Sequence, residues 1–269
     1  MLKMRRVFAM AIASALLIAG VFFVFARRTP AQTREHPGKN SGALRVYTSD
    51  GIKAAYLELV PQMEQATGRK LVTVFDSSKN IRSKIQAGEP FDVAILTSDI
   101  IDDLIGQGKI SAKSRTDLAR TGIGLGVRAG AHKPDVSTPE AIKQTLLNAK
   151  SISFNPSGAS AVHIYDMFDR LGIAGAVKPK LILNAEAGGP QRYVVAGKAE
   201  LVMTLVPEIQ FFPGMELAGP LPGEFQSYVN FSAGVATGTR DRAAARALIQ
   251  FLSGPVMAPV LKAKGMEPR

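Results

Sequence analysis

Cysteine and tryptophan are absent from the 269 residues of the chain, and histidine occurs only three times. Without cysteine, the protein has no disulfide framework, no thiolate-bound zinc or iron–sulfur site and no thiol nucleophile. The three histidines, His36, His132 and His163, lie far apart in the sequence, which disfavours a histidine-based metal site or catalytic triad. We therefore expect neither a metal site nor another cofactor.

Positive charge exceeds negative charge, with 33 lysines and arginines against 22 aspartates and glutamates and a formal net charge of +11. Such a balance can indicate a nucleic-acid partner. Five of the positive charges, however, flank an apolar run near the N-terminus, at positions 3, 5, 6, 27 and 28, which leaves +6 for the rest of the chain. No basic cluster interleaved with aromatic residues follows residue 28. We therefore expect no nucleic-acid partner.

The apolar run, residues 7–26, contains no charged residue and follows a basic start. This pattern is typical of a secretory signal, and the run is also long enough to span a bilayer as a helix. We interpret residues 1–31 as a signal peptide or an N-terminal membrane anchor, with a buried core helix as the weaker alternative. Residues 32–42 are polar and indicate a tether. The basic residues before the run predict that the following chain lies outside the cytoplasmic membrane.

Strand and helix signals alternate after residue 43. Residues 44–48, 70–75 and 91–96 are rich in β-forming residues, and helical patterns follow each of them, which predicts a parallel sheet with covering helices. A second group of strands is expected at 151–154, 180–183 and 200–206. Two longer strands, near 122–130 and 228–238, would connect the two groups. We predict two α/β lobes joined by two hinge strands, with residues 43–121 plus 231–269 in lobe 1 and residues 122–230 in lobe 2.

Three loops follow predicted strands and precede predicted helices, at residues 49–51, 76–78 and 155–160. Their small hydroxyl residues and glycines let backbone N–H groups approach a ligand, and a helix N-terminus favours an anion. Helix capping is the alternative role for each loop by itself. We expect few or no cationic side chains in the pocket that these loops would form.

Motifs of common enzymes are missing from the sequence, including GxSxG, GxxxxGK[ST], HExxH and GxGxxG followed by an acidic residue. Asp50 and Glu186 could act as a pair of carboxylates, although solvated or capping roles are the favoured interpretation. Arg192 and Tyr193 could reach a ligand, although surface or packing roles are favoured there too. The glycines at 122, 124 and 126 lie inside a predicted strand and would ease a bend.

Residues 44–110 resemble the extracytoplasmic molybdate-binding proteins of ABC importers. The matching features are a small-residue loop after the first strand (VYTSDG), a helix that ends at TG, a VFDSS loop, and IQAGEPFDV before the third strand. The stretches DMFDRLGI at 166–173, the strand region 197–208 and FLSGPVMAPVLKAKGMEP at 251–268 are also similar to that family. The resemblance implies the two-lobed type II periplasmic-binding-protein fold.

The family's ligand contacts map onto defined positions of this chain. A serine of the first loop corresponds to Gly51, with Ser49 two positions earlier and Asp50 between them. A tyrosine of the family corresponds to Leu205 or its neighbour Thr204, so two side-chain contacts differ here. The ligand-binding residues that the resemblance implies are Ser49, Asp50, Gly51, Ser77, Ser78, Ser160, Ala161, Ala187, Gly188 and Thr204.

These observations predict an extracytoplasmic solute-binding protein of an ABC importer that binds a small oxyanion, such as molybdate or tungstate, between its lobes. Its partners would be the ligand and the permease subunits in the membrane, and we expect a monomer without enzymatic activity. One alternative is a membrane-tethered sensor or accessory domain that binds another small solute. A further alternative is an enzyme that uses Asp50 or Glu186 as a base.

Overall fold

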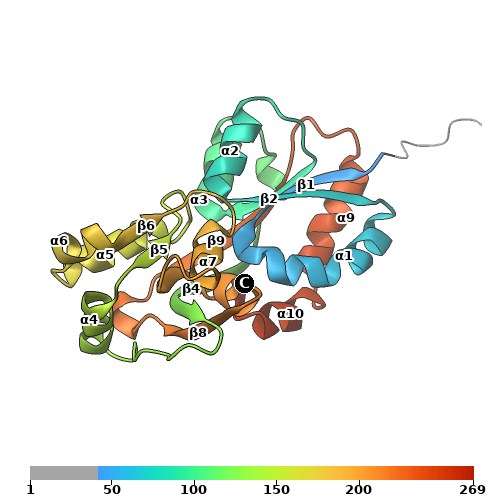
Figure 1. The fold of residues 1–269 in the computed structure, drawn as a ribbon. Helices are drawn as coiled ribbons and strands as arrows, with labels where there is room; N and C mark the ends of the chain where they lie inside the picture. Colours follow the sequence, from blue (N-terminus) through green and yellow to red (C-terminus); the bar gives the residue numbers. More distant parts are fainter. Residues whose placement is uncertain (1–41) are drawn as a thin grey trace, which may run out of the picture. The chain divides into compact units, whose positions relative to one another are not determined.

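The computed structural model describes residues 42–269 (Figure 1). The predictions for the leader, residues 1–31, and for all but the last residue of the tether lie outside the described residues. Within residues 42–269, no single helix is both long and apolar enough to cross a membrane.

A first sheet is built around three parallel strands. β1 (Leu44–Ser49) lies between β2 (Leu71–Asp76) and β3 (Val93–Thr97), and β9 (Tyr228–Val235) runs antiparallel to β3. The short β10 (Glu267–Pro268) pairs with β4. The helices of this half are α1 (Lys53–Thr67), α2 (Ser78–Gln86), α3 (Ser98–Gly106), α9 (Arg242–Leu252) and α10 (Met257–Ala263), with a 3-10 turn at Asp50–Ile52.

A second sheet contains two parallel pairs and two antiparallel ones. β5 (Ile152–Phe154) lies between β6 (Leu181–Leu183) and β7 (Leu201–Leu205), and β7 and β8 (Met215–Pro220) both run antiparallel to β4. The helices of this half are α4 (Pro139–Asn148), α5 (Ala161–Arg170), α6 (Ala174–Val177), α7 (Gly189–Val195) and α8 (Val206–Gln210).

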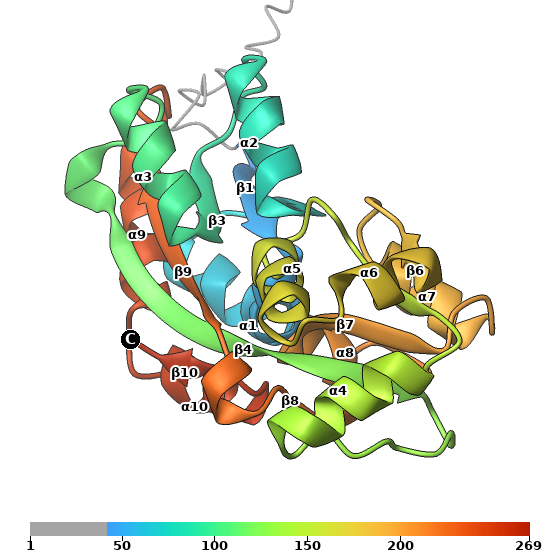
Figure 2. The ribbon, with the colours of Figure 1, turned by 90° about the vertical axis from the view of Figure 1, so that its left-hand side faces the viewer.

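The strand β4 (Thr116–Arg128) belongs to both sheets. Residues 116–122 pair with β9, whereas residues 123–128 pair with β7 and β8. Figure 2 shows β4 as one long strand that runs from the side of α3 and α9 to the side of α4. The predicted α/β fold with two long connecting strands is confirmed, although β4 begins six residues earlier than the predicted strand at 122. The lobe boundaries stay a prediction.

Three glycines of β4 stand where neighbouring side chains approach its backbone closely. A Cβ atom at Gly122 would lie 2.8 Å from the Gln226 side chain, one at Gly124 2.8 Å from Leu217, and one at Gly126 2.6 Å from Ile209. These glycines therefore permit close packing against β4, in addition to any bend of the strand.

The apolar core is continuous between the two halves. One cluster of buried residues extends from Leu44 of β1 to Met266 near the C-terminus and includes Ile123 and Leu125 of β4. Burial of such a cluster supplies the main favourable free energy of folding. In α1, the buried residues Ala55, Tyr56, Leu59 and Met63 recur at helical spacing, and Gly68 ends the helix with a φ of 63°.

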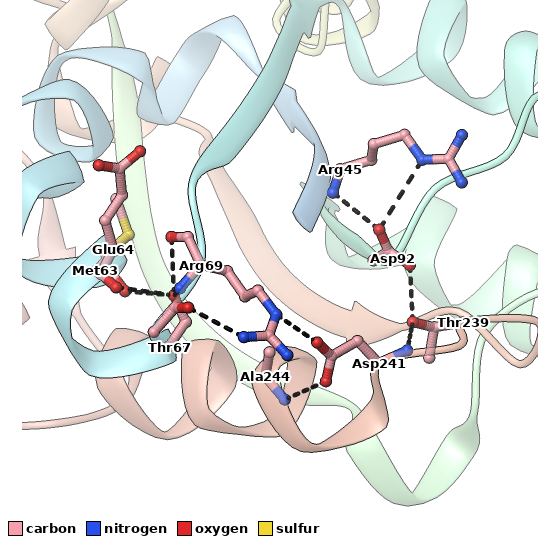
Figure 3. A network of polar contacts seen from close by, with 10 residues as sticks. Arg45, Met63, Glu64, Thr67, Arg69, Asp92, Thr239, Asp241 and Ala244 are labelled. Carbon is pink, nitrogen blue, oxygen red and sulfur yellow. Dashed lines mark hydrogen bonds and ion pairs between the residues drawn. The ribbon is translucent and has the colours of Figure 1, made fainter. Parts of the chain in front are cut away.

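A network of polar contacts fixes the C-terminal helices to the first sheet (Figure 3). Asp241 caps α9 by accepting a hydrogen bond from the backbone N–H of Ala244, at 3.1 Å, and its other oxygen accepts one from Nε of Arg69, at 2.7 Å. Nearby, Thr239 donates to Asp92, which also accepts the backbone N–H of Arg45 at 2.8 Å. The chain therefore returns after β9 to pack α9 against α1.

Replacing Asp241 tests this capping contact. We expect Asp241→Ala to lower the free energy of unfolding by about 1–2 kcal/mol, because both the helix cap and the partner of Arg69 are lost. Asp241→Asn keeps a capping oxygen and should cost clearly less. Urea unfolding of both variants measures the difference, and an equal loss for the two would contradict a capping role.

Candidate anion-binding pocket

A cavity of about 380 Å³ is lined by residues from both halves of the molecule. The first half contributes the loop after β1 and the starts of α1 and α2. The second half contributes the loops at 155–159 and 187–192, the end of β7 with α8, and residues 211–213. The carboxyl ends of parallel strands and the starts of helices thus meet at the cavity, where open α/β folds bind their ligands.

Three serine hydroxyls of the first half face this region, and each accepts a backbone N–H. Ser49 accepts from Gly51 at 3.4 Å, Ser77 from Asn80 at 3.2 Å, and Ser78 from Thr97 at 3.1 Å. Ser49 and Ser77 therefore cap the helices that follow them. Because a hydroxyl that accepts a hydrogen bond keeps its own hydrogen, each serine can still donate one to an anion.

Gly51 lies outside the cavity lining. A Cβ atom at this position would lie 2.6 Å from Cζ of Phe231 and 2.7 Å from Cδ1 of Leu205. The space that a side chain would need is thus filled by two core residues. The serine that the family resemblance implies at this position would have no room for its side chain here.

The other residues implied by the sequence divide into two groups. The cavity lining includes Ser49, Asp50, Ser77, Ser78, Ala187, Gly188 and Thr204. Ser160 and Ala161 are both buried at the start of α5 and lie outside the lining. From this loop, the lining contains Asn155, Gly158 and Ala159 instead. Roles of all these residues in ligand binding stay predictions.

Glu208 of α8 is the most perturbed acidic residue of the cavity, and sequence reasoning missed it. Its carboxylate accepts a hydrogen bond from the Thr204 hydroxyl. The pKa of Glu208 is raised to about 7, mainly by desolvation and to a smaller extent by the negative charge of Asp50, against the lowering effect of the Thr204 bond. In the sequence, Glu208 stands at the end of the strand region 197–208 and carries no signal of a binding role, because its enclosure depends on the tertiary structure.

Asp50 is the second carboxyl group of the cavity. Burial raises its pKa above the usual range, whereas the neighbouring charges of Lys53 and Arg192 lower it. Asp50 and Glu208 thus both belong to the cavity lining, and the charge of Asp50 contributes to the raised pKa of Glu208. Glu186, the partner considered from the sequence, has a side chain that is 76% exposed and pairs with Arg192 at 3.0 Å outside the cavity.

Cationic side chains reach the cavity from three elements, contrary to the expectation of few or none. Lys53 starts α1, Arg192 lies on α7, and Lys264 follows α10. Arg192 also donates to the carbonyl of Ala187 at 2.8 Å, and Lys264 pairs with Glu58 at 2.7 Å. Arg192 was considered as a ligand contact from the sequence. Lys53 and Lys264 carried no such signal, because their approach depends on the packing of α1 and α10.

Gln191 adds an unusual polar group to the lining. The residue is only 5% exposed, and its Nε2 donates to the backbone carbonyl of Glu208 at 3.4 Å. Its Oε1 has no hydrogen-bond partner among the described residues. An unsatisfied buried acceptor of this kind costs about 1–3 kcal/mol.

A metal site has no support within residues 42–269, where no group of three or more His, Asp or Glu side chains could hold an ion. The cavity lining thus combines hydroxyl and cationic donors with carboxyl and amide acceptors.

Solved structures with the same architecture define the class of the protein. The periplasmic molybdate-binding protein of Azotobacter vinelandii superposes with a TM-score of 0.67 at 18% identity, over 83% of this chain and 98% of that chain. The protein thus has the fold of the type II periplasmic binding proteins, as predicted.

Sequence comparisons define the family. The family described as "Bacterial extracellular solute-binding protein" matches residues 44–267. An aconitate isomerase of Pseudomonas sp. is 30% identical over 231 residues, which are 84% of this chain and 87% of that protein. The molybdate-binding protein ModA of Azotobacter vinelandii is 28% identical over 230 residues, 82% of this chain and 88% of that protein. The chain belongs to the bacterial extracellular solute-binding protein family, and its resemblance to molybdate-binding proteins is confirmed.

The raised pKa of Glu208 predicts a pH-dependent stability. Between pH 4.5 and about 7, the folded protein keeps this proton whereas the unfolded chain releases it. The stabilisation is therefore fully present below pH 4.5 and is lost as the pH rises through about 7. The full effect is about 3 kcal/mol. Glu208→Gln mimics the neutral carboxyl group and should flatten this dependence, whereas Glu140→Gln, at the exposed start of α4, should not.

Urea unfolding at pH 5 and pH 8 measures the effect. The difference in unfolding free energy between Glu208→Gln and the unaltered protein should grow in favour of the variant at pH 8. An identical pH dependence of the two proteins would contradict the enclosed, proton-binding carboxyl group.

Proposed function

We propose that the cavity binds a small organic anion with more than one carboxyl group. The observation that carries this proposal is the presence of three cationic side chains, Lys53, Arg192 and Lys264, around a cavity that also holds Asp50 and Glu208. Lysine and arginine form charge-assisted hydrogen bonds with carboxylates, and the serine hydroxyls and the start of α2 add neutral donors. A cavity of about 380 Å³ is within the range of small-molecule sites.

An inorganic oxyanion such as molybdate or tungstate is the prediction from the sequence, and the geometry supports it less well. A dianion that stays fully ionised at neutral pH would be repelled by Asp50 and by ionised Glu208. Gly51 offers no hydroxyl in place of the serine of the molybdate-binding proteins. A partly protonated organic acid avoids this repulsion, because it can share a proton with the two carboxyl groups.

The family supports an extracytoplasmic place for the protein and a role in delivering solute to an ABC permease. We propose that the leader exports or anchors the chain and that the folded part acts as a monomer. A membrane-tethered sensor for the same kind of solute is the alternative, and it would use the same cavity.

Binding measurements test the ligand class. We expect isothermal titration to show binding of citrate, cis-aconitate or trans-aconitate, and none of comparable strength for molybdate, tungstate or sulfate. Arg192→Gln should weaken carboxylate binding about tenfold or more, because it removes a charged donor. Arg128→Gln, which alters an exposed arginine at the end of β4, is the matched control and should leave carboxylate binding unchanged. Binding of molybdate without binding of any carboxylate would overturn the proposal in favour of the inorganic oxyanion.

A second candidate function is the isomerisation of an unsaturated tricarboxylate. The carboxyl groups of Asp50 and Glu208 in the cavity lining favour it, because the pKa of Glu208, about 7, is suited to proton transfer at neutral pH. The relative named aconitate isomerase supports the same idea.

The reaction needs no oxidant, metal or covalent intermediate. A carboxylate removes a proton from the methylene carbon next to the double bond, and the resulting allylic anion delocalises its charge onto a substrate carboxylate. Return of the proton to the other end of the allyl unit shifts the double bond and completes the isomerisation. Lys53, Arg192 or Lys264 would stabilise the charge that develops on that carboxylate.

Incubation with cis-aconitate in D₂O tests this candidate. NMR spectra should show trans-aconitate with deuterium at the allylic carbons, and Glu208→Gln should lose at least 100-fold in turnover while it still binds the ligand. Glu208→Gln, purified in the same way as the unaltered protein, controls for contaminating isomerases. Binding without any isomerisation or deuterium exchange by the unaltered protein would leave the solute-binding function and reject the enzymatic one.

A further inference from the structure

The orientation of the Gln191 side-chain amide follows from the hydrogen bond that it donates. Gln191 is only 5% exposed on the short helix α7, and its Nε2 donates to the backbone carbonyl of Glu208 at 3.4 Å. A flipped amide would place two oxygens against each other at this contact, so the donor end must face the carbonyl. The acceptor end, Oε1, consequently lacks a partner among residues 42–269.

The cavity lining carries two further groups of acceptor oxygens. Gln191, Glu208 and Asp50 all belong to the lining, together with Thr204, whose hydroxyl hydrogen is already given to Glu208. The cationic groups of Lys53, Arg192 and Lys264 are the charged donors of the same lining. A fully ionised anion without a hydroxyl group can satisfy the cations and the serines, but it has no hydrogen to offer to the acceptors.

We infer that Gln191 is a specificity-determining residue that selects a ligand with a hydrogen-bond donor, a hydroxyl or an undissociated carboxyl group, beside its ionised carboxylates. Because Oε1 is enclosed by its neighbours, the ligand reaches it when the terminal amide turns toward the cavity. The long bond to the Glu208 carbonyl resists this turn only weakly. This inference rests on the proposed binding of an organic acid.

The selection would follow from the cost of leaving an acceptor unpaired. A site that is built to accept a hydrogen bond discriminates strongly against an analogue that lacks the donor, because the buried acceptor then stays unsatisfied. The backbone N–H groups and the cations of the cavity cannot provide this discrimination, since each of them is a donor. The carboxylates of Asp50 and Glu208 also accept hydrogen bonds, so the test compares variants that differ at Gln191 alone.

Two probes with the same three carboxyl groups separate the sources of the donor. Citrate carries a hydroxyl group on its central carbon, and tricarballylate has a hydrogen atom in its place. At pH 8, where the carboxyl groups of both probes are ionised, titration should show citrate binding about tenfold or more tightly than tricarballylate if the hydroxyl is the donor. If an undissociated carboxyl is the donor, tricarballylate should bind more tightly as the pH falls from 8 to 5.

Gln191→Met removes the acceptor at similar size, and Gln191→Asn keeps an amide with both a donor and an acceptor. We expect the methionine variant to abolish the citrate preference or the pH dependence, and the asparagine variant to retain part of it. Gln144→Met on α4 is the matched control. Thermal unfolding of each variant shows whether it is folded, and the asparagine variant keeps the test valid if the methionine variant is not.

The results distinguish a failure of the organic-acid function from a failure of the role of Gln191. Binding of neither probe by the unaltered protein would reject the organic-acid function itself. Binding of both probes, with the same preference and the same pH dependence in the unaltered protein and in Gln191→Met, would overturn the role of Gln191 and leave the organic-acid function standing.

Discussion

The pairing of β4 with two different sheets is the constraint on which the structure depends. Its first residues complete the sheet that contains β1 and β3, and its last residues form the edge to which β7 and β8 add. Because one extended strand spans both halves, the loops at the carboxyl ends of their parallel strands come to face a common cavity. The close approach of side chains to Gly122, Gly124 and Gly126 keeps this strand packed on both sides.

The charge pattern of the cavity follows from that arrangement. Asp50 and Lys53 come from the first half, Glu208 and Arg192 from the second half, and Lys264 from the segment that returns to the first half at the C-terminus. Asp50 and Glu208 are far apart in the sequence, and the effect of the Asp50 charge on the pKa of Glu208 arises only where the halves meet. A family of solute-binding proteins can in this way change its ligand chemistry without changing its fold, since function depends on the site and not on the architecture.

The fold was largely predictable because its signals are local and repeated. Apolar residues at helical spacing, short β-rich runs and glycines at helix ends place α1, β2 and β3 within a few residues of their observed bounds. The serine loops were likewise found from the sequence, since Ser49 and Ser77 precede helices and cap them. The start of β4 was missed, because residues 116–121 include polar and charged side chains that a half-exposed strand tolerates.

By itself, the sequence determined the alternating α/β pattern, the two long connecting strands, the capping serines and the membership of a binding-protein family. Only the tertiary structure decided which charged groups share the cavity. It placed Glu208 in the same cavity as Asp50 and left Glu186 outside it, brought Lys53 and Lys264 to the lining, and filled the space beside Gly51 with Phe231 and Leu205. The physical reason is that periodicity and capping act over a few residues, whereas desolvation and charge pairing depend on segments far apart in the sequence.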